Sequence, residues 1–458
     1  MKSENKTLDM CSGSLTKKIL IFTIPLMLSG LLQLLYNAAD VIVVGRYAGQ
    51  EALAAVGTTG ALINLILNLF IGLSGGVSVA MARVVGAKND KEIHNVVHTA
   101  ISISIIAGAF LTVVGIILSE YMLKLISVPT EILPQAVSYM HMIFYGMIPS
   151  MVFNFGSAVL RSKGDTKRPL YVVSVSGIIN VILNVYFVTE FKMGAAGVGL
   201  ATTIAQTVSA VLLLWILTRQ TDSSKLIFHR LKININQLIF IVKIGVPAGI
   251  QGIVFSLSNI IVQSGINSFG SACMAGCAAA GNIEGFMFTA LDSFSQSAMT
   301  FVSQNIGAKK YARINKVTLT SLMYVAVLGI LIAFISCFCG EFLMKIYCPT
   351  DPDAVNIGCL RLKILGISYI LCGFQSVLCS VLRGMGASFS GMVATILGIC
   401  GTRIVWVYTI FKQIGTLESL LVSYPISWAG TAIIFFVMYL IAKRSFKFDT
   451  DVLTAHSI

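Results

Sequence analysis

The chain alternates long apolar runs with short polar segments along its whole length. Each run is about 20 residues or longer, the length that an α-helix needs to cross ~30 Å of hydrocarbon. The pattern predicts twelve membrane-spanning helices, at 18–44, 52–80, 92–118, 133–158, 169–190, 194–218, 237–264, 270–302, 314–338, 355–381, 389–411 and 416–442. An all-α polytopic membrane protein is therefore expected. The first run is too long for the core of a signal peptide, so it is expected to remain as the first helix.

Positive charges lie mostly in alternate connections between the apolar runs. Of the 32 Lys and Arg residues, 24 lie in the two tails and in or beside every second connection, 7 lie in or near the other connections, and Arg403 alone lies deep inside a run. This asymmetry is typical of cytoplasmic loops, so both termini are expected on the cytoplasmic side of the inner or plasma membrane. The net charge of +13 then requires no nucleic-acid partner.

The composition excludes an ordinary soluble protein and gives little support to metal or catalytic chemistry. Charged residues make up only 11% of the chain, against about 25% in a typical soluble domain. Nine of the ten cysteines follow residue 270, mostly inside apolar runs, as buried thiols would. No cluster has the spacing of a metal site, and no nucleophile stands beside a base. We therefore expect no metal, no cofactor and no enzyme activity.

The chain also repeats itself at an offset of about half its length. "FTIPLMLSGL" (22–31) is similar to "IGVPAGIQGI" (244–253), "VVGAKNDKEI" (84–93) to "NIGAKKYARI" (305–314), and "AVLRSKG" (158–164) to "SVLRGMG" (380–386). Because each half holds six spans, the halves share an orientation, and a pseudo-two-fold axis along the membrane normal is expected.

The repeat predicts two six-helix lobes around a central cavity. The N-terminal lobe is expected at 1–218, a cytoplasmic linker at 219–236, and the C-terminal lobe at 237–458. Pro25 and Pro247 occupy matching places in the first helix of each lobe. Each removes a helix hydrogen bond and favours a kink, which serves either as a hinge or only as shape.

The first predicted helix carries an ionisable side chain among apolar residues. Gln33, Tyr36, Asn37 and Asp40 are spaced i, i+3, i+4 and i+7, so they lie along one stripe. An ionised Asp in lipid costs about 2.5–3.5 kcal/mol on the insertion scale, so Asp40 is a functional candidate. From Lys18 it lies roughly 33 Å along the helix, in the outer half, where H⁺ or Na⁺ from outside would reach it.

Partners for Asp40 are expected on the fifth and sixth predicted spans. Asn180 and Asn184 are spaced i,i+4 on the fifth, and Thr202 and Gln206 are spaced i,i+4 on the sixth. Their amides and hydroxyls either supply oxygens to a small cation or act only as hydrogen bonds between helices.

The second half differs chemically, because Val262 and Gln263 stand at the offset of Asp40. Its polar candidates for substrate or second-ion binding are Asn259, Gln263, Glu284, Asp292 and Gln296. Glu284 and Asp292 either bind a cationic substrate or ion, or one of them lies near an interface or pairs with Arg403.

Several of these segments together resemble one transporter family. The segments are "NAADVIVVGRYAGQEALAAVG" (37–57), the "VVGAK" and "QNIGAK" loops, "LRSKGDTKRP" (160–169) and the twin six-helix halves. The chain is similar over nearly its whole length to the multidrug and toxic compound extrusion (MATE) family. The resemblance implies a V-shaped pair of lobes that exports organic cations in exchange for H⁺ or Na⁺.

The resemblance also implies an ion site in the N-terminal lobe. Tyr36, Asp40, Asn180 and Thr202 match its pattern, but Asn184 stands where the family pattern has a second acid. This difference leaves the coupling ion open between H⁺ and Na⁺. Some relatives instead place an acid on the seventh span. This chain has none there, although Glu284 and Asp292 would be able to take its place.

The sequence therefore favours alternating-access antiport by a monomer in the lipid bilayer, with a small organic cation as substrate. Removal from water favours the neutral form of a carboxyl group, so Asp40 would take up H⁺ or Na⁺ as the cation leaves. An alternative is a lipid-linked oligosaccharide flippase of related fold, which would need a strongly cationic cavity. A channel is disfavoured because no filter-like loop is found.

Overall fold

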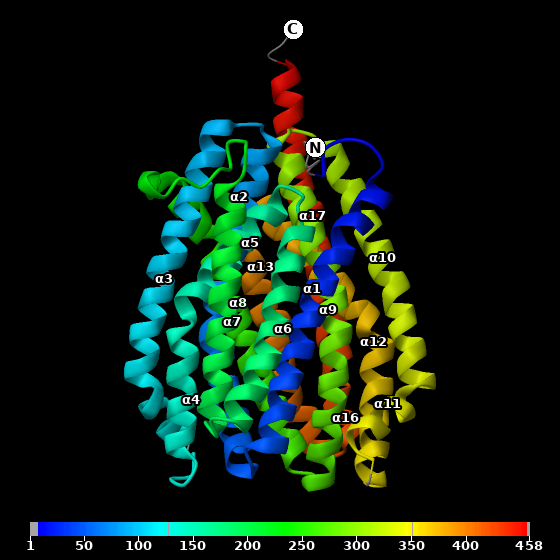
Figure 1. Ribbon diagram of the computed structural model, residues 1–458. Coiled ribbons are helices and arrows are strands. Elements are labelled where there is room, and N and C mark those ends of the chain that lie inside the picture. The colour runs from blue at the N-terminus through cyan, green and yellow to red at the C-terminus, as the bar shows by residue number, and fades with distance from the viewer. Residues whose placement is uncertain (1–7, 127, 350, 456–458) are drawn as a thin grey trace. The chain divides into compact units, whose positions relative to one another are not determined.

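The computed structural model describes residues 8–126, 128–349 and 351–455, and this part of the chain is helical with no strand. In the first half the helices are α1 (Leu15–Tyr47), α2 (Gln50–Gly86), α3 (Asp90–Leu125), α4 (Leu133–Tyr145), α5 (Met147–Ser162), α6 (Lys167–Thr189) and α7 (Gly194–Thr218). Figure 1 shows α3 and α4 side by side. A short 3₁₀ turn, η1 (Phe228–Arg230), precedes the second half.

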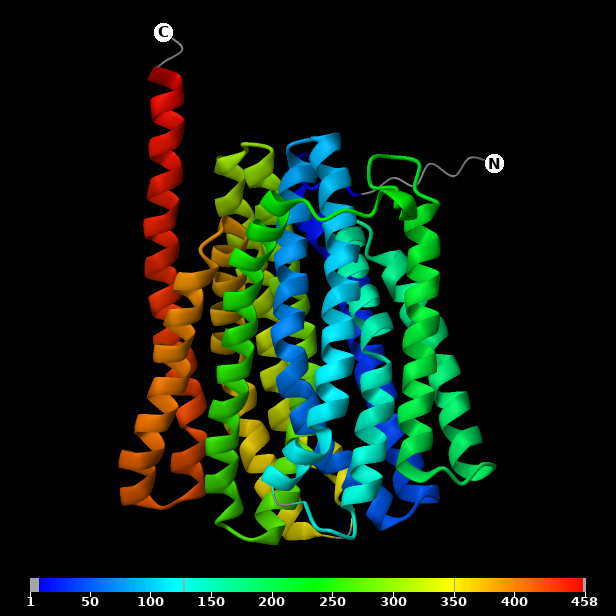
Figure 2. The same ribbon diagram turned by 90° about the vertical axis from the view of Figure 1, so that its left-hand side faces the viewer.

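The second half begins with three long helices and ends with a segmented region. The elements are α8 (Ile235–Asn267), α9 (Ser271–Gly307), α10 (Tyr311–Phe338), α11 (Gly340–Tyr347), α12 (Pro352–Met385), α13 (Ser388–Thr395), η2 (Ile396–Gly401), α14 (Thr402–Trp406), η3 (Val407–Phe411), α15 (Lys412–Ile414), α16 (Leu417–Leu421) and α17 (Ser423–Ala455). In Figure 2, α17 is the red helix that continues to Ala455.

Twelve spans follow from these helices, as the hydrophobic pattern predicts. Ten helices in the described residues are long and apolar enough to cross a membrane, and α4 with α5 forms an eleventh span that bends by 46°. α9 has 37 residues, so its length suffices, but its polar side chains make it less apolar than the others. It is the twelfth span of the fold. The stretches 388–414 and 417–444 each count as one span.

The bend between α4 and α5 is stabilised by a side chain of α7. The break falls at Gly146, whose N–H donates to the carbonyl of Ile143 at 3.0 Å, one residue short of an α-helical bond. The carbonyl of Met142 is thereby left without its helical partner, and the hydroxyl of Thr203 donates to it at 2.5 Å. A backbone group freed within the membrane is satisfied by a neighbouring helix.

The helices form two compact units whose limits differ from the predicted lobes. One unit contains 1–9 and 24–249, and the other contains 10–23 and 250–458. Relative to lobes at 1–218 and 237–458, the start of α1 belongs with the second half and the start of α8 with the first. The linker predicted at 219–236 lies inside the first unit. The limits cross α1 beside Pro25 and α8 beside Pro247.

Close glycine packing explains why the start of α8 belongs to the first unit. A Cβ atom built on Gly72 of α2 would lie 2.2 Å from the backbone nitrogen of Gly249 on α8, and one on Gly76 would lie 2.3 Å from the carbonyl oxygen of Ile241. The two backbones are therefore in direct contact. Small residues favour such contacts in lipid, where apolar burial between helices drives little association.

The start of α1 and the segment before it are held by the second unit. The amide of Asn305 donates to the carbonyl of Met10 at 3.2 Å, and the Lys310 ammonium donates to the carbonyl of Cys11 at 2.9 Å. Phe22 packs edge-on against Phe301, with ring centroids 5.7 Å apart. Polar bonds and aromatic packing thus attach 10–23 to α9 and to the turn that follows it.

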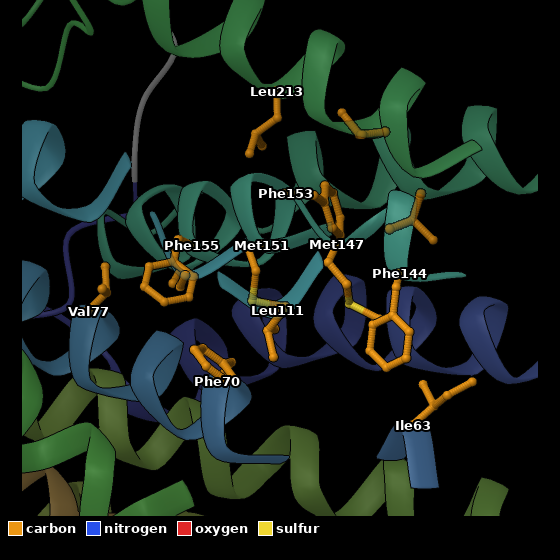
Figure 3. Packing of buried hydrophobic residues seen from close by; sticks show 14 of the residues in the cluster. Ile63, Phe70, Val77, Leu111, Phe144, Met147, Met151, Phe153, Phe155 and Leu213 are labelled. Carbon is orange, nitrogen blue, oxygen red and sulfur yellow. The ribbon is translucent and has the colours of Figure 1, made fainter. Parts of the chain in front are cut away.

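The core of the first unit is packed mainly by α2, α3 and α5, and α4 and α7 contribute fewer residues. Figure 3 shows Met147 directed toward the ring of Phe144, and Leu111 beside Met151. All four side chains are buried. Buried side chains at this density gain dispersion contacts that lipid tails supply less completely.

The linker after α7 is held to the end of α5 by Lys163. This ammonium is buried, lies 2.6 Å from a carboxylate oxygen of Asp222 and donates to the hydroxyl of Ser224. Partial burial opposes ionisation of Asp222, but the bonds from Lys163 and Ser224 prevail and lower the pKa of that carboxyl. The linker is therefore attached to the first unit rather than free.

We expect Gly72→Ala to destabilise the first unit by about 1–3 kcal/mol, because the added methyl group overlaps the backbone of α8. The matched control is Gly75→Ala in the same helix, where an added Cβ meets no atom within 4 Å. Thermal unfolding of the purified protein measures both. Equal melting temperatures for the two variants would contradict the close packing of α2 and α8.

Candidate functional site

Asp40 lies at the centre of a polar network inside the first unit. It belongs to α1 and is 8% exposed. Asn180 and Asn184 come from α6, and Thr202 comes from α7. All three neutral side chains lie around the carboxylate, so the structure brings together four of the residues that the sequence places at one site. Their role in ion coupling stays a prediction.

The four side chains close a ring of hydrogen bonds. The amide nitrogen of Asn184 donates to Oδ1 of Asp40 and to Oδ1 of Asn180, the latter at 3.2 Å. The amide nitrogen of Asn180 donates to the hydroxyl of Thr202 at 3.3 Å. That hydroxyl lies 3.5 Å from Oδ2 of Asp40. Both carboxylate oxygens thus face neutral donors, and no Lys or Arg forms a salt bridge with Asp40 among the described residues.

One oxygen of this ring has no partner. Asn184 is fully buried, and its Oδ1 makes no hydrogen bond. A buried carbonyl oxygen without a donor is costly, and it can bind either a proton donor or a cation. Together with the oxygens of Asp40 and Thr202 it gives an oxygen-rich donor set. Oxygen ligands of this kind suit a hard cation such as Na⁺, and the same atoms suit a protonated carboxyl group.

Tyr36 lies one turn from this ring rather than in it. Its hydroxyl donates to the carbonyl of Ser174 on α6 at 3.4 Å. Its ring lies against Gly177, where an added Cβ would come within 1.8 Å of ring atoms. The glycine therefore lets α1 and α6 approach, which places Asp40 within reach of Asn180 and Asn184, one and two turns further along α6.

Tyr139 of α4 is a neighbour that the sequence analysis missed. It is close enough to Asp40 to interact with it electrostatically. Nothing in the local pattern distinguishes this tyrosine from other aromatic residues of the spans. Its proximity follows from the packing of α4 against α7, which also carries Thr202.

The predicted stripe on α1 divides into two parts. Tyr36 and Asp40 face α6, whereas Gln33 and Asn37 are exposed and have no hydrogen-bond partner among the described residues. The exposed apolar side chains Leu28, Leu35 and Ile42 lie on the opposite face of the helix. Because an exposed amide is disfavoured in hydrocarbon, the face with Gln33 and Asn37 requires contact with water or polar groups. Gln206 of α7 is half-buried.

Glu284 of α9 is paired, and its partner is not Arg403. The guanidinium of Arg361 donates to both carboxylate oxygens at 2.8 Å each, and both side chains are almost fully buried. Arg361 lies inside α12 and not in a connecting segment. The pair neutralises Glu284, which argues against its predicted role as a binding site for a cationic substrate or ion.

Asp292 remains without a salt bridge. It is half-buried on α9 and accepts a hydrogen bond from Gln296 at 2.7 Å. Arg383 of α12 is its charged neighbour. The hydroxyls of Thr300 and Ser303 further along the face donate to carbonyls of their own helix. Asp292 and Gln296 therefore remain candidates for substrate or ion binding.

The polar candidates on α8 are separated from each other. Asn259 accepts a hydrogen bond from Arg403 at 2.8 Å. Gln263 is exposed and donates to Asn267 of its own helix at 2.9 Å. Asn259 is thus committed to a buried arginine, while Gln263 makes only a local bond.

A family model and similar proteins of known sequence agree on one family of transporters. The family model MatE matches residues 25–186 and 247–409, one stretch in each half. The "Probable multidrug resistance protein YoeA" of Bacillus subtilis is 28% identical over 93% of this chain and 94% of its own length. The "FAD transporter" of Shewanella oneidensis is 24% identical over 84% and 85%.

Solved structures share the fold. A MOP superfamily transporter from Pyrococcus furiosus aligns with a TM-score of 0.90 at 21% identity, over 97% of this chain and 100% of the other. A MATE protein in complex with MaL6 gives a TM-score of 0.90 at 21% identity, over 96% and 99%.

We expect Glu284→Gln to destabilise the second unit by about 3–5 kcal/mol, because it leaves the buried Arg361 guanidinium without its anion. Replacing both residues, as Glu284→Leu with Arg361→Leu, should recover most of the loss. The control is Lys345→Met, which removes an exposed ion pair with Glu341 and should leave thermal unfolding unchanged. A single variant as stable as the double variant would contradict the importance of the pair.

Proposed function

We propose that this chain, which belongs to the MatE family of membrane transporters, is a secondary active transporter that exports small organic cations in exchange for H⁺ or Na⁺. The observation that carries the proposal is the closed ring around Asp40. It surrounds one buried carboxylate with neutral donors and leaves one amide oxygen free. Such a group changes its bonding when it gains a proton or a small cation.

The ring gives the coupling ion a direct effect on α1. While Asp40 is ionised, the amide of Asn184 donates to it. The hydroxyl of Thr202 lies 3.5 Å from the carboxylate and has the carbonyl oxygen of Val198, at 3.0 Å, as a second acceptor. Once H⁺ or Na⁺ neutralises the carboxylate, these donors lose their charged acceptor, and the free oxygen of Asn184 becomes the better partner. The position of α1 relative to α6 and α7 then changes, because the hydrogen bonds of Asp40 that join these helices have changed.

The prolines are suited to convert this shift into a larger movement. Pro25 and Pro247 lie next to the places where α1 and α8 pass from one compact unit to the other. A proline cannot donate a backbone hydrogen bond, so the carbonyls of Ile21 and Lys243 lack their usual helical donor. Bending therefore costs less at these positions than elsewhere in either helix. We infer that both act as hinges during alternating access.

The site is proposed to work in the cell membrane with both termini in the cytoplasm. The charge asymmetry of the connections supports this orientation. It also places Asp40 toward the outside, where an inward gradient of H⁺ or Na⁺ supplies the ion. We further propose that a monomer suffices, because the whole ring comes from one unit of one chain.

The flippase alternative is less well supported. Such a protein would need several uncompensated cations to bind a pyrophosphate. Two arginines, Arg361 and Arg403, are buried in the second unit, but Glu284 neutralises the first. One remaining buried cation is too few for that ligand.

The Asp40→Asn variant should fold and insert normally but lose coupling, because an amide neither takes up a proton in this pH range nor offers a charge to Na⁺. We expect substrate-dependent ion uptake by proteoliposomes to fall to the level of protein-free vesicles. Asp165→Asn, the same chemical change in a loop pair with Arg168, should retain uptake. Undiminished uptake by Asp40→Asn would remove this residue from the mechanism.

The coupling ion is identified by imposing the pH gradient and the Na⁺ gradient separately on the same proteoliposomes. Efflux that follows only one gradient assigns that ion. We expect a response to at least one, because the ring offers oxygens to both. Efflux that ignores both gradients would contradict secondary active transport.

A further inference from the structure

Arg403 is a buried cation in the second unit that the proposed coupling site does not use. It lies on α14 and is 0% exposed. Its guanidinium lies over the ring of Tyr424 at 4.1 Å and over that of Phe255 at 5.4 Å. Aromatic rings interact with the face of a guanidinium, whereas an anion binds in its plane, where the N–H groups point.

All the hydrogen-bond partners of Arg403 in the described chain are neutral. Nη1 donates to the amide oxygen of Asn259 at 2.8 Å, and Nε donates to the hydroxyl of Ser427 at 3.1 Å. No carboxylate lies within salt-bridge distance in the described residues. The titratable groups that act on it electrostatically include Tyr424, Cys372, Cys400 and Arg361, and the last of these carries the same charge.

One nitrogen of the guanidinium has no partner. Nη2 of Arg403 is buried and donates to no atom in the described chain. A charged donor is thus left unsatisfied inside the unit. A buried donor without a partner requires an explanation, and one explanation is a bound ion.

The helix around Arg403 is also irregular. α14 has five residues and lies between two π-helical segments, η2 and η3. π-helical segments inside a span occur frequently at functional sites. The two segments displace Arg403 from the register of a regular helix, and the irregularity therefore coincides with the unsatisfied guanidinium.

Arg361 is a second buried cation of the same unit, and its charge is neutralised within the protein. Both carboxylate oxygens of Glu284 accept from it. Arg403 is buried more completely and has no such anion. A lone charge in a low-dielectric interior is strongly disfavoured unless a counter-charge neutralises it.

We propose that Arg403 is the centre of an anion-binding site in the second unit, with Nη2 as its free donor. The ligand is a group with one negative charge and lone pairs that accept from a guanidinium. Two sources share this chemistry: a free halide ion, and the carboxylate of a transported molecule. Binding of the second source rests on the proposed transport function, whereas binding of the first does not.

The free ion is tested with the purified full-length protein in lipid nanodiscs. Thermal unfolding is followed while gluconate is replaced by chloride at constant ionic strength, since gluconate is a polyhydroxylated, strongly hydrated anion that apolar surroundings exclude. We expect a saturable rise of the melting temperature by about 3 °C. A rise without saturation would indicate a general salt effect and would count against a bound halide.

Two variants assign any response to this site. Arg403→Gln removes the charge, and Asn259→Asp places a carboxylate at the position that already accepts from Nη1. Both should abolish the chloride response. Asn259→Asp should in addition melt no lower than the wild-type protein in gluconate, because it supplies the missing anion. This variant keeps the test valid if Arg403→Gln does not fold. A saturable response that survives in Asn259→Asp would overturn the site.

The second source is tested by equilibrium binding of a rhodamine with a free benzoate group and of its methyl ester. We expect Asn259→Asp to weaken binding of the acid about tenfold and leave the ester unchanged if the substrate supplies the anion. If chloride supplies it, the variant affects neither dye but abolishes the chloride response. The proposal would be overturned if the wild-type protein showed no saturable chloride response and if the wild-type protein and Asn259→Asp bound the acid dye with equal affinity. None of these measurements requires transport, so failure of antiport would leave them interpretable.

Discussion

The burial of charge in a membrane-spanning bundle is the constraint on which the polar architecture of this protein depends. Hydrocarbon solvates no ion, so each buried charge requires compensation from the protein or from a ligand. The structure uses three arrangements. Asp40 is surrounded by neutral donors, Glu284 is matched by Arg361, and Arg403 has two aromatic rings and neutral acceptors. Only the charges of Glu284 and Arg361 neutralise each other. Asp40 and Arg403 have no counter-charge from the described chain and so retain the capacity to bind an ion.

The arrangement around Asp40 depends on backbone packing as much as on polar chemistry. Tyr36 lies against Gly177, and this contact fixes how closely α1 approaches α6. A larger residue at Gly177 would separate the helices and move Asp40 away from Asn184. The same principle joins α2 to α8 through Gly72 and Gly249. Small side chains therefore determine which polar groups meet, although they make no polar contact themselves.

Sequence reasoning reached the twelve spans and the partners of Asp40, because hydropathy and helical spacing are local properties. Asn180 and Asn184 are one turn apart, so a shared face was visible. The partner of Glu284 was not, since Arg361 lies 77 residues away along the chain and no local pattern links the two. Tyr139 was not predicted as a neighbour of Asp40, because nothing in the local sequence distinguishes it from other aromatic residues of the spans. The unit limits depend on tertiary contacts of α1 and α8, which the repeat pattern alone does not contain.

The exchange of helix ends between the two units has a consequence for how the chain assembles. Each unit takes one helical stretch from the other half of the sequence: 10–23 belongs to the later unit, and the first turns of α8 belong to the earlier one. A polypeptide severed in the linker would yield two fragments, each lacking a piece of its own interior and carrying a surplus piece of the other. The packing of the earlier unit is therefore complete only once the start of α8 has been synthesised.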